Sequence, residues 1–155
     1  MSHSDNWGVV CIEHQFDDYY AQFMHLLSTG NYGTKDANIT PENFPGQCIG
    51  DFKAVLVLFD CQMKHNTAMQ EIKGSNYRPA TMIELLAYGA WFPDEQMEYS
   101  IAALGQSWED PKRGPCVGSL PHKSLDRELI LYPCSMPFGS KCRFLAVCEP
   151  KAKAA

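Results

Sequence analysis

The sequence predicts an α+β domain in which helices pack on a small, irregular antiparallel sheet. Three features favour this class: an apolar run at Phe52–Phe59, a helix-start signal at Thr81 to Glu84, and three short apolar patches in the last third of the chain. A strand, then helices, then several strands in succession is typical of α+β proteins. The 155 residues suffice for one domain with a real core.

The first fifty residues are expected to form an N-terminal extension of this same unit. Trp7–Ile12 has the content of a short strand, and a helix is predicted from Phe16 to Leu27. Phe16, Tyr20, Phe23 and Leu27 recur at helical spacing and would form its buried stripe. Gly, Asn, Thr and Pro dominate residues 31–50, so we expect a long connecting loop that carries an interface.

The middle of the chain contains its strongest strand and its strongest helix start. Phe52–Phe59 is apolar on both faces apart from Lys53, which predicts a central strand. The polar segment Cys61–Asn76 shows no pattern that assigns it to a helix or a strand. Thr81 and Glu84 are spaced as a capping box, so a helix should run from Thr81 to Tyr88, with Gly89 as its left-handed terminator.

A second short helix is predicted at Pro93–Glu98, where a proline opens the first turn and acidic residues complement the helix dipole. Ser100–Trp108 should then be a strand, with Gly105 marking a bulge or a close backbone approach. A turn is expected at Glu109–Gly114.

The last third, Gly114–Val147, alternates apolar patches with polar loops. Cys116–Val117, Leu129–Leu131 and Phe144–Val147 are predicted strands. Period-two alternation assigns Leu129 and Leu131 to the core, and Glu128, Ile130 and Tyr132 to the opposite face. Residues 133–140 mix apolar side chains with turn formers, which indicates a loop suited to binding.

Composition excludes several partners. The net charge is −5, with 13 Lys and Arg against 18 Asp and Glu, so the chain is not expected to bind nucleic acid or a charged membrane surface. No apolar run could span a bilayer and residues 1–6 lack a secretion-signal pattern, so we expect a soluble protein made in the cytoplasm. Seven cysteines without a CxxC motif argue against a disulfide framework.

Catalytic and metal-binding signatures are weak. Cys61 and His65 would share a helix face and could bind zinc together with His14, His25 or another cysteine, but a buried thiol beside a surface imidazole explains them better. A Cys–His nucleophile pair could also be assembled, although no motif selects one. Gly-rich phosphate loops are absent from the sequence. We therefore expect no enzyme activity, metal or cofactor.

Several short sequence segments resemble those of a known family. Tyr77–Thr81 with Glu84–Leu86, Ile101–Gly105 with Trp108, and Arg143–Val147 resemble, in order and spacing, variable proteins of diversity-generating retroelements. Members of that family adopt the C-type lectin fold. The resemblance covers about Phe52 to Val147 and implies that residues 114–147 are a variable region, in which a retroelement randomises template adenines.

The resemblance also implies which positions vary, because randomised Asn codons can encode only some residue types. By this filter, nine residues are expected to be displayed on one exposed, ligand-binding face: Ser119, His122, Asp126, Ile130, Tyr132, Ser135, Phe138, Ser140 and Cys142. Four others are weaker candidates: Lys123, Glu128, Met136 and Lys141. The expected fixed frame comprises Arg127, Leu129, Leu131, Arg143, Phe144 and Leu145.

Two functions remain open from the sequence. The first is a display protein whose C-terminal loops bind a protein or glycan receptor, at the surface of a virus or a microbe. The alternative is a small enzyme of unknown class on a lectin-like or ordinary α+β scaffold, because a fold does not fix a function. The sequence does not specify the ligand or the oligomeric state.

Folding without a metal can be tested directly. Because ligand spacing is absent, a strong chelator should change Tm by no more than about 2 °C, which corresponds to well under 1 kcal/mol. Thermal melts with and without the chelator measure this. A fall of many degrees would show that Cys or His side chains hold a structural metal.

Overall fold

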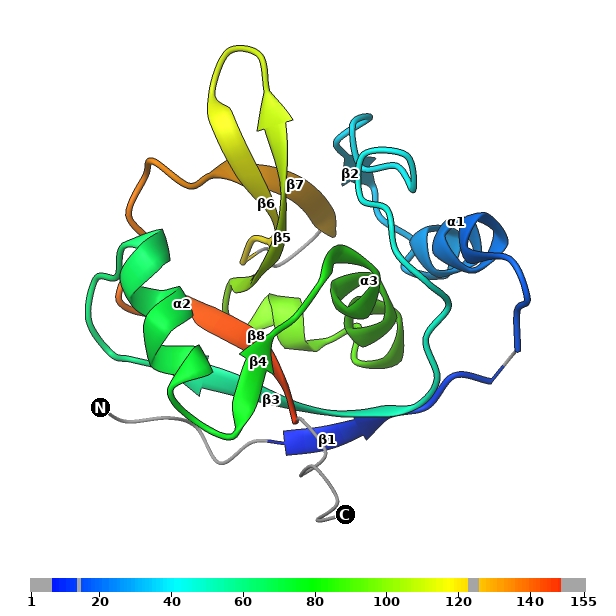
Figure 1. The fold of residues 1–155 in the computed structure, drawn as a ribbon, viewed down its shortest axis with the longest axis horizontal. Helices are drawn as coiled ribbons and strands as arrows, with labels where there is room; N and C mark the ends of the chain where they lie inside the picture. Colours follow the sequence, from blue (N-terminus) through cyan, green and yellow to red (C-terminus); the bar gives the residue numbers. More distant parts are fainter. Residues whose placement is uncertain (1–6, 14, 123–125, 149–155) are drawn as a thin grey trace, which may run out of the picture.

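The computed structural model describes residues 7–13, 15–122 and 126–148. Across these residues the chain forms three α-helices, one 3-10 turn and eight strands, which confirms the α+β class (Figure 1). The elements in order are β1 (Trp7–Val10), α1 (Tyr19–Thr29), β2 (Thr34–Lys35), β3 (Phe52–Leu58), α2 (His65–Lys73), β4 (Tyr77–Pro79), α3 (Met82–Trp91), η1 (Glu95–Met97), β5 (Ile101–Asp110), β6 (Gly114–Leu120), β7 (Glu128–Pro133) and β8 (Arg143–Cys148). No helix in the described ranges is both long and apolar enough to span a membrane.

The sheet is mixed and eight-stranded, so the expectation of a small antiparallel sheet was wrong. Its strands lie in the order β1-β3-β8-β5-β6-β7-β2, and β4 pairs with β8 outside this path. The pairs β5 with β8 and β2 with β7 are parallel, whereas the other pairs are antiparallel. Both parallel pairs join strands far apart in the sequence, and such pairing leaves no local pattern.

The sheet separates two hydrophobic cores. In β3, Ala54 and Leu56 belong to a core shared with α1 and α3, while Val55 and Val57 belong to a second core shared with α2. The same alternation occurs in β8, where Leu145 faces the first core. The prediction that Phe52–Phe59 is a central strand, buried on both faces, is confirmed.

The predicted capping box at the start of α3 is present. The Glu84 carboxylate accepts hydrogen bonds from the backbone N–H of Thr81 at 2.9 Å and from its hydroxyl at 3.1 Å. Glu84 is buried, and its charge is balanced by a bidentate contact with Arg78 at 2.7 and 2.5 Å. One carboxylate therefore fastens β4 to the first turn of α3.

Gly89 does not terminate this helix, contrary to the prediction. The helix continues through Gly89 to Trp91, and Gly114 is the glycine with a positive φ in the described residues. A Cβ at Gly89 would overlap the Tyr32 hydroxyl, so glycine is required here by close packing.

α1 begins later than predicted, and α2 was not predicted. α1 begins at Tyr19, with Asp18 as its N-cap, and buries Gln22, Phe23, Leu26 and Leu27; Tyr20, predicted to be buried, is 51 % exposed. α2 lies in the segment that permitted no assignment, and its buried residues are Ala68 and Ile72.

The predicted helix at Pro93–Glu98 is reduced to the single 3-10 turn η1. Its Gln96 side chain is buried and donates hydrogen bonds to the carbonyls of Pro121 at 2.8 Å and Glu128 at 2.6 Å. The turn thus connects the end of β6 to the start of β7, and the chain enters β5 four residues after Met97.

Both expectations for Gly105 are confirmed. The pairing of β5 with β6 shifts register between Ala103 and Ser107, which is a bulge. Gly105 N–H donates to the carbonyl of Ala80 at 2.8 Å, and an added Cβ would lie 2.5 Å from the carbonyl oxygen of Pro79. The bulge and the small residue together let the β4–α3 connection lie against β5.

Buried and outward-facing residues alternate along β7 as predicted. Leu129 and Leu131 are buried in the first core, whereas Glu128, Ile130 and Tyr132 are half-buried on the other face. Ser119 pairs with Ile130, and Val117 pairs with Tyr132, so these β6 residues share that second face.

Adjacent residues of β7 offer a matched test of this phase. Leu131→Ala should lower the free energy of unfolding by about 2–5 kcal/mol because it leaves a cavity in the core. Ile130→Ala, on the half-buried face, should cost about 1 kcal/mol. Urea unfolding of both variants measures the difference; equal losses would mean that the two faces are equally packed.

Candidate functional site

A groove of about 390 Å³ lies on the second face of β6 and β7, beside the loop that leads to β8. Four segments separated in the sequence line it: Glu98–Ser100, the end of β6 with Pro121 and His122, the outward residues of β7, and residues 138–142. We call it the β6–β7 groove. Its lining residues are Glu98, Tyr99, Ser100, Ser119, Pro121, His122, Ile130, Tyr132, Phe138, Gly139, Lys141 and Cys142.

Six of the nine residues expected on the ligand-binding face line this groove. They are Ser119, His122, Ile130, Tyr132, Phe138 and Cys142. The other three, Asp126, Ser135 and Ser140, are exposed but lie outside its lining. Of the weaker candidates, Lys141 lines the groove, and Lys123 lies outside the described residues.

Two of the nine are buried and three, Ile130, Tyr132 and Cys142, are half-buried, so the prediction that all nine are largely accessible was wrong. Ser119 is only 5 % exposed because it lies within β6, between β5 and β7. Phe138 is 3 % exposed because its ring packs into the second core. Phe138 therefore belongs to the fixed frame that supports the groove.

Backbone hydrogen bonds hold the 134–142 loop, which forms one wall of the groove. Phe138 and Met63 exchange two bonds as an isolated antiparallel bridge, with N–O distances of 2.8 and 3.1 Å. Cys134 N–H donates to the carbonyl of Pro115 at 2.8 Å. Because these bonds use main-chain atoms, they do not depend on which side chains the loop carries.

Two side chains add to this anchoring. The Tyr132 hydroxyl donates to the carbonyl of Pro137 at 2.7 Å. Lys141 Nζ lies 2.9 Å from an Asp60 carboxylate oxygen, although both groups are largely exposed and such pairs contribute little stability. The loop is thus attached to β7 and to the segment after β3.

A row of aromatic rings forms the base of this wall. Ring centroids are 4.8 Å apart for Tyr132 and Phe138, 5.1 Å for Phe138 and Phe144, and 5.6 Å for Phe144 and Phe59. Tilted and edge-to-face pairs at these separations are favourable. The row extends from the groove into the second core.

Three ionisable side chains that line the groove, Tyr99, Tyr132 and Cys142, have raised pKa values. Burial raises the pKa of the Cys142 thiol to about 12. Burial, together with a hydrogen bond to Glu95, raises the pKa of Tyr99 to about 12. The pKa of Tyr132 is also raised, chiefly by burial. The interior therefore offers aromatic rings, hydroxyl groups and a protonated thiol.

His122 is held in a defined orientation at the rim. Its backbone N–H donates to Ser100 Oγ at 2.9 Å, and its ring Nε2 lies 2.8 Å from the carbonyl oxygen of Met97. Since a carbonyl only accepts, Nε2 carries the proton, and Nδ1 is the remaining acceptor. His122 is thus positioned as a polar contact for a ligand.

The groove provides little for metal or nucleophilic chemistry. In the part of the chain that the structure describes, no three His, Cys, Asp or Glu side chains are grouped to bind a metal; His14 lies outside that part. The Cys142 thiol contacts the carbonyl of Arg143 at 3.6 Å, and the His122 ring contacts the Met97 carbonyl. Cys142 and His122 thus contact different backbone carbonyls, and these contacts do not pair the thiol with the imidazole.

Sequence reasoning missed the wall formed by Glu98, Tyr99 and Ser100. Tyr99 is held by its hydroxyl contact with Glu95 and by the guanidinium of Arg143, whose carbon lies 4.0 Å from the ring centroid. These residues lie where the predicted helix Pro93–Glu98 meets the predicted strand Ser100–Trp108, and only the folded sheet brings them beside β7. No sequence signal of the kinds used above would have found them.

Thiol labelling tests the environment of the groove. Burial raises the pKa of Cys134 from 9.0 to about 11 and that of Cys142 to about 12, so both thiols should react slowly with iodoacetamide at pH 8. The exposed Cys11 and Cys61 should be modified first. Labelling of the buried pair should accelerate only as pH rises towards these values, and folding should lose stability over the same interval. Peptide mass spectrometry over time measures the order; early labelling of Cys142 would contradict it.

Compared with protein-family models, with curated proteins and with solved structures, the chain shows no match.

Proposed function

We propose that this protein is a ligand-binding display protein of the kind encoded by diversity-generating retroelements, with a C-type lectin-like fold. The β6–β7 groove and the 134–142 loop would be its variable surface. One observation carries the proposal: five positions expected from the sequence to vary, Ser119, His122, Ile130, Tyr132 and Cys142, line one groove, on the sheet face opposite the core residues Leu129 and Leu131.

The physical organisation of the groove supports this function. A diversified site needs a frame whose geometry survives changes of side chain. Main-chain bonds between Phe138 and Met63, and between Cys134 and Pro115, supply such a frame for the loop. The exposed residues Ser135, Met136 and Ser140 project from this loop, and substitutions at such positions usually change stability little.

The groove chemistry favours an uncharged part of the ligand. Ile130, Tyr132 and Tyr99 offer apolar and aromatic surface, and His122 and Ser119 add polar groups, a division of roles found in other diversified binding sites. Charged groups are confined to Glu98 and Lys141. An aromatic or aliphatic protein side chain, or the apolar face of a sugar, fits this surface.

The DNA that flanks the gene provides the test. We expect a reverse-transcriptase gene and a near-copy of the segment that encodes residues 114–147, with differences at adenines of the copy. The differences should fall on codons of exposed or groove-lining residues such as His122, Ile130 and Ser140. Codons for Leu129, Leu131 and the core residue Phe138 serve as the internal control and should match. Absence of both the gene and the copy, or differences concentrated in these core codons, would contradict the proposal.

A further inference from the structure

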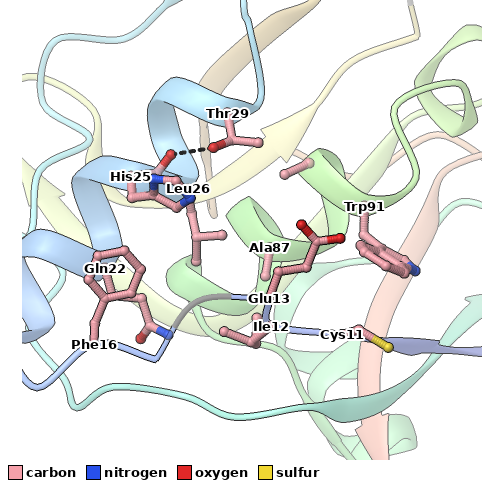
Figure 2. Close-up of a pocket in the computed structure, with 11 residues that line it drawn as sticks. Cys11, Ile12, Glu13, Phe16, Gln22, His25, Leu26, Thr29, Ala87 and Trp91 are labelled. Carbon is pink, nitrogen blue, oxygen red and sulfur yellow. Dashed lines mark hydrogen bonds between the residues drawn. The ribbon is translucent and has the colours of Figure 1, made fainter.

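A second groove of about 390 Å³ lies between α1 and α3, beside the segment that follows β1 (Figure 2). It shares no lining residue with the β6–β7 groove. We call it the α1–α3 groove. Its volume is within the range of small-molecule sites, roughly 300–1,000 Å³.

The interior of this groove is apolar. Leu26 and Ala87 are buried, and Ala90 is half-buried; the two alanines leave space that larger side chains would fill. Both polar side-chain atoms of the buried Gln22 are already engaged, because its amide exchanges two hydrogen bonds of 2.8 Å with the backbone of Ile49. A ligand would therefore place an apolar body here.

Aromatic rings lie on either side of the α1–α3 groove. Trp91 ends α3 and is 39 % exposed, although large apolar side chains are usually covered. Phe16 lies opposite, packed against His25 with ring centroids 5.2 Å apart. Such rings offer faces that attract cations as well as apolar groups.

Glu13 supplies a negative charge at the same place. Glu13 is exposed and lines the groove, and Figure 2 shows its carboxylate between Ala87 and Trp91. In the described part of the chain this carboxylate forms neither an ion pair nor a hydrogen bond. An unpaired carboxylate beside an indole ring is the combination that recognises an ammonium group, and the net charge of −5 also attracts cations.

We propose that the α1–α3 groove binds a small organic amine. Its ammonium group contacts the Glu13 carboxylate and the face of Trp91, and its apolar body packs on Leu26, Ala87 and Ala90. This site is independent of the β6–β7 groove and does not rest on the display function.

Titration of ¹⁵N-labelled protein with 2-phenylethylamine at pH 7, followed by two-dimensional NMR, tests the proposal. We expect saturable shifts of the backbone amides of Ile12, Leu26 and Ala90 and of the Trp91 indole N–H. The neutral analogue 2-phenylethanol, which has the same apolar body, should bind about tenfold more weakly, as expected for the loss of one charge-assisted contact.

Three variants separate the contribution of the Glu13 charge from that of the apolar groove interior. Glu13→Gln should abolish the preference for the amine while leaving the alcohol unaffected, whereas the matched control Glu109→Gln, on the exposed side of β5, should change neither. Ala90→Leu should fill the groove and weaken both compounds. If Ala90→Leu does not fold, Trp91→Ala takes its place, since Trp91 is partly exposed at a helix end.

Several outcomes would overturn the inference. These are shifts that do not saturate, shifts that map to the β6–β7 groove, equal affinity for the alcohol and the amine, and a Glu13→Gln variant that retains the preference for the amine. Each of these would mean that the carboxylate and the indole do not form an ammonium site.

Discussion

One half-buried arginine, Arg127, immediately before β7, ties two helices to the sheet. Its guanidinium donates to the carbonyl of Gly30, which caps α1, and at 2.7 Å to that of Gly89 in the last turn of α3. The same group lies 4.6 Å from the ring centroid of Tyr32. Helix C-termini carry partial negative charge and unpaired carbonyls, and neither helix has a basic residue in its own last turn. One cation from the sheet thus satisfies two helices and fixes their position relative to β7.

The contacts of Arg127 explain how β7 can contribute both to the core and to the wall of the groove. Main-chain bonds from Gly33 and Thr34 to the carbonyl of Arg127 continue the attachment on the β2 side. The position of the strand is therefore set by its first residues and by the inward leucines, and the outward residues Ile130 and Tyr132 are left to form the groove wall. Separating the residues that fix a strand from those that meet a ligand is what a variable site requires.

Local patterns predicted the elements whose causes are local. The capping box at Thr81, the two-sided apolar run of β3 and the alternation in β7 each depend on neighbouring residues, and each was confirmed. α2 was missed because its buried face rests on Ala68 and Ile72, too few apolar residues for a recognisable stripe. The burial of Phe138 follows from its pairing with Met63, a contact between distant segments that no sequence period encodes. The sequence predicted only the groove residues that come from the last third of the chain. Tyr99 and Ser100 were missed because the pairing of distant strands brings them to the groove.

The two hydrophobic cores also explain why the groove lies where it does. α2 covers β3, β4 and β8 on the second face, and its contacts extend to β5. Beyond β5, no helix of the described residues covers that face, so the outward residues of β6 and β7 meet the 134–142 loop instead. A loop covers a sheet less completely than a helix because it lacks a continuous apolar stripe. The groove is therefore a consequence of where α2 ends, and the bridge from Phe138 to Met63, just before α2, determines how far the loop closes over it.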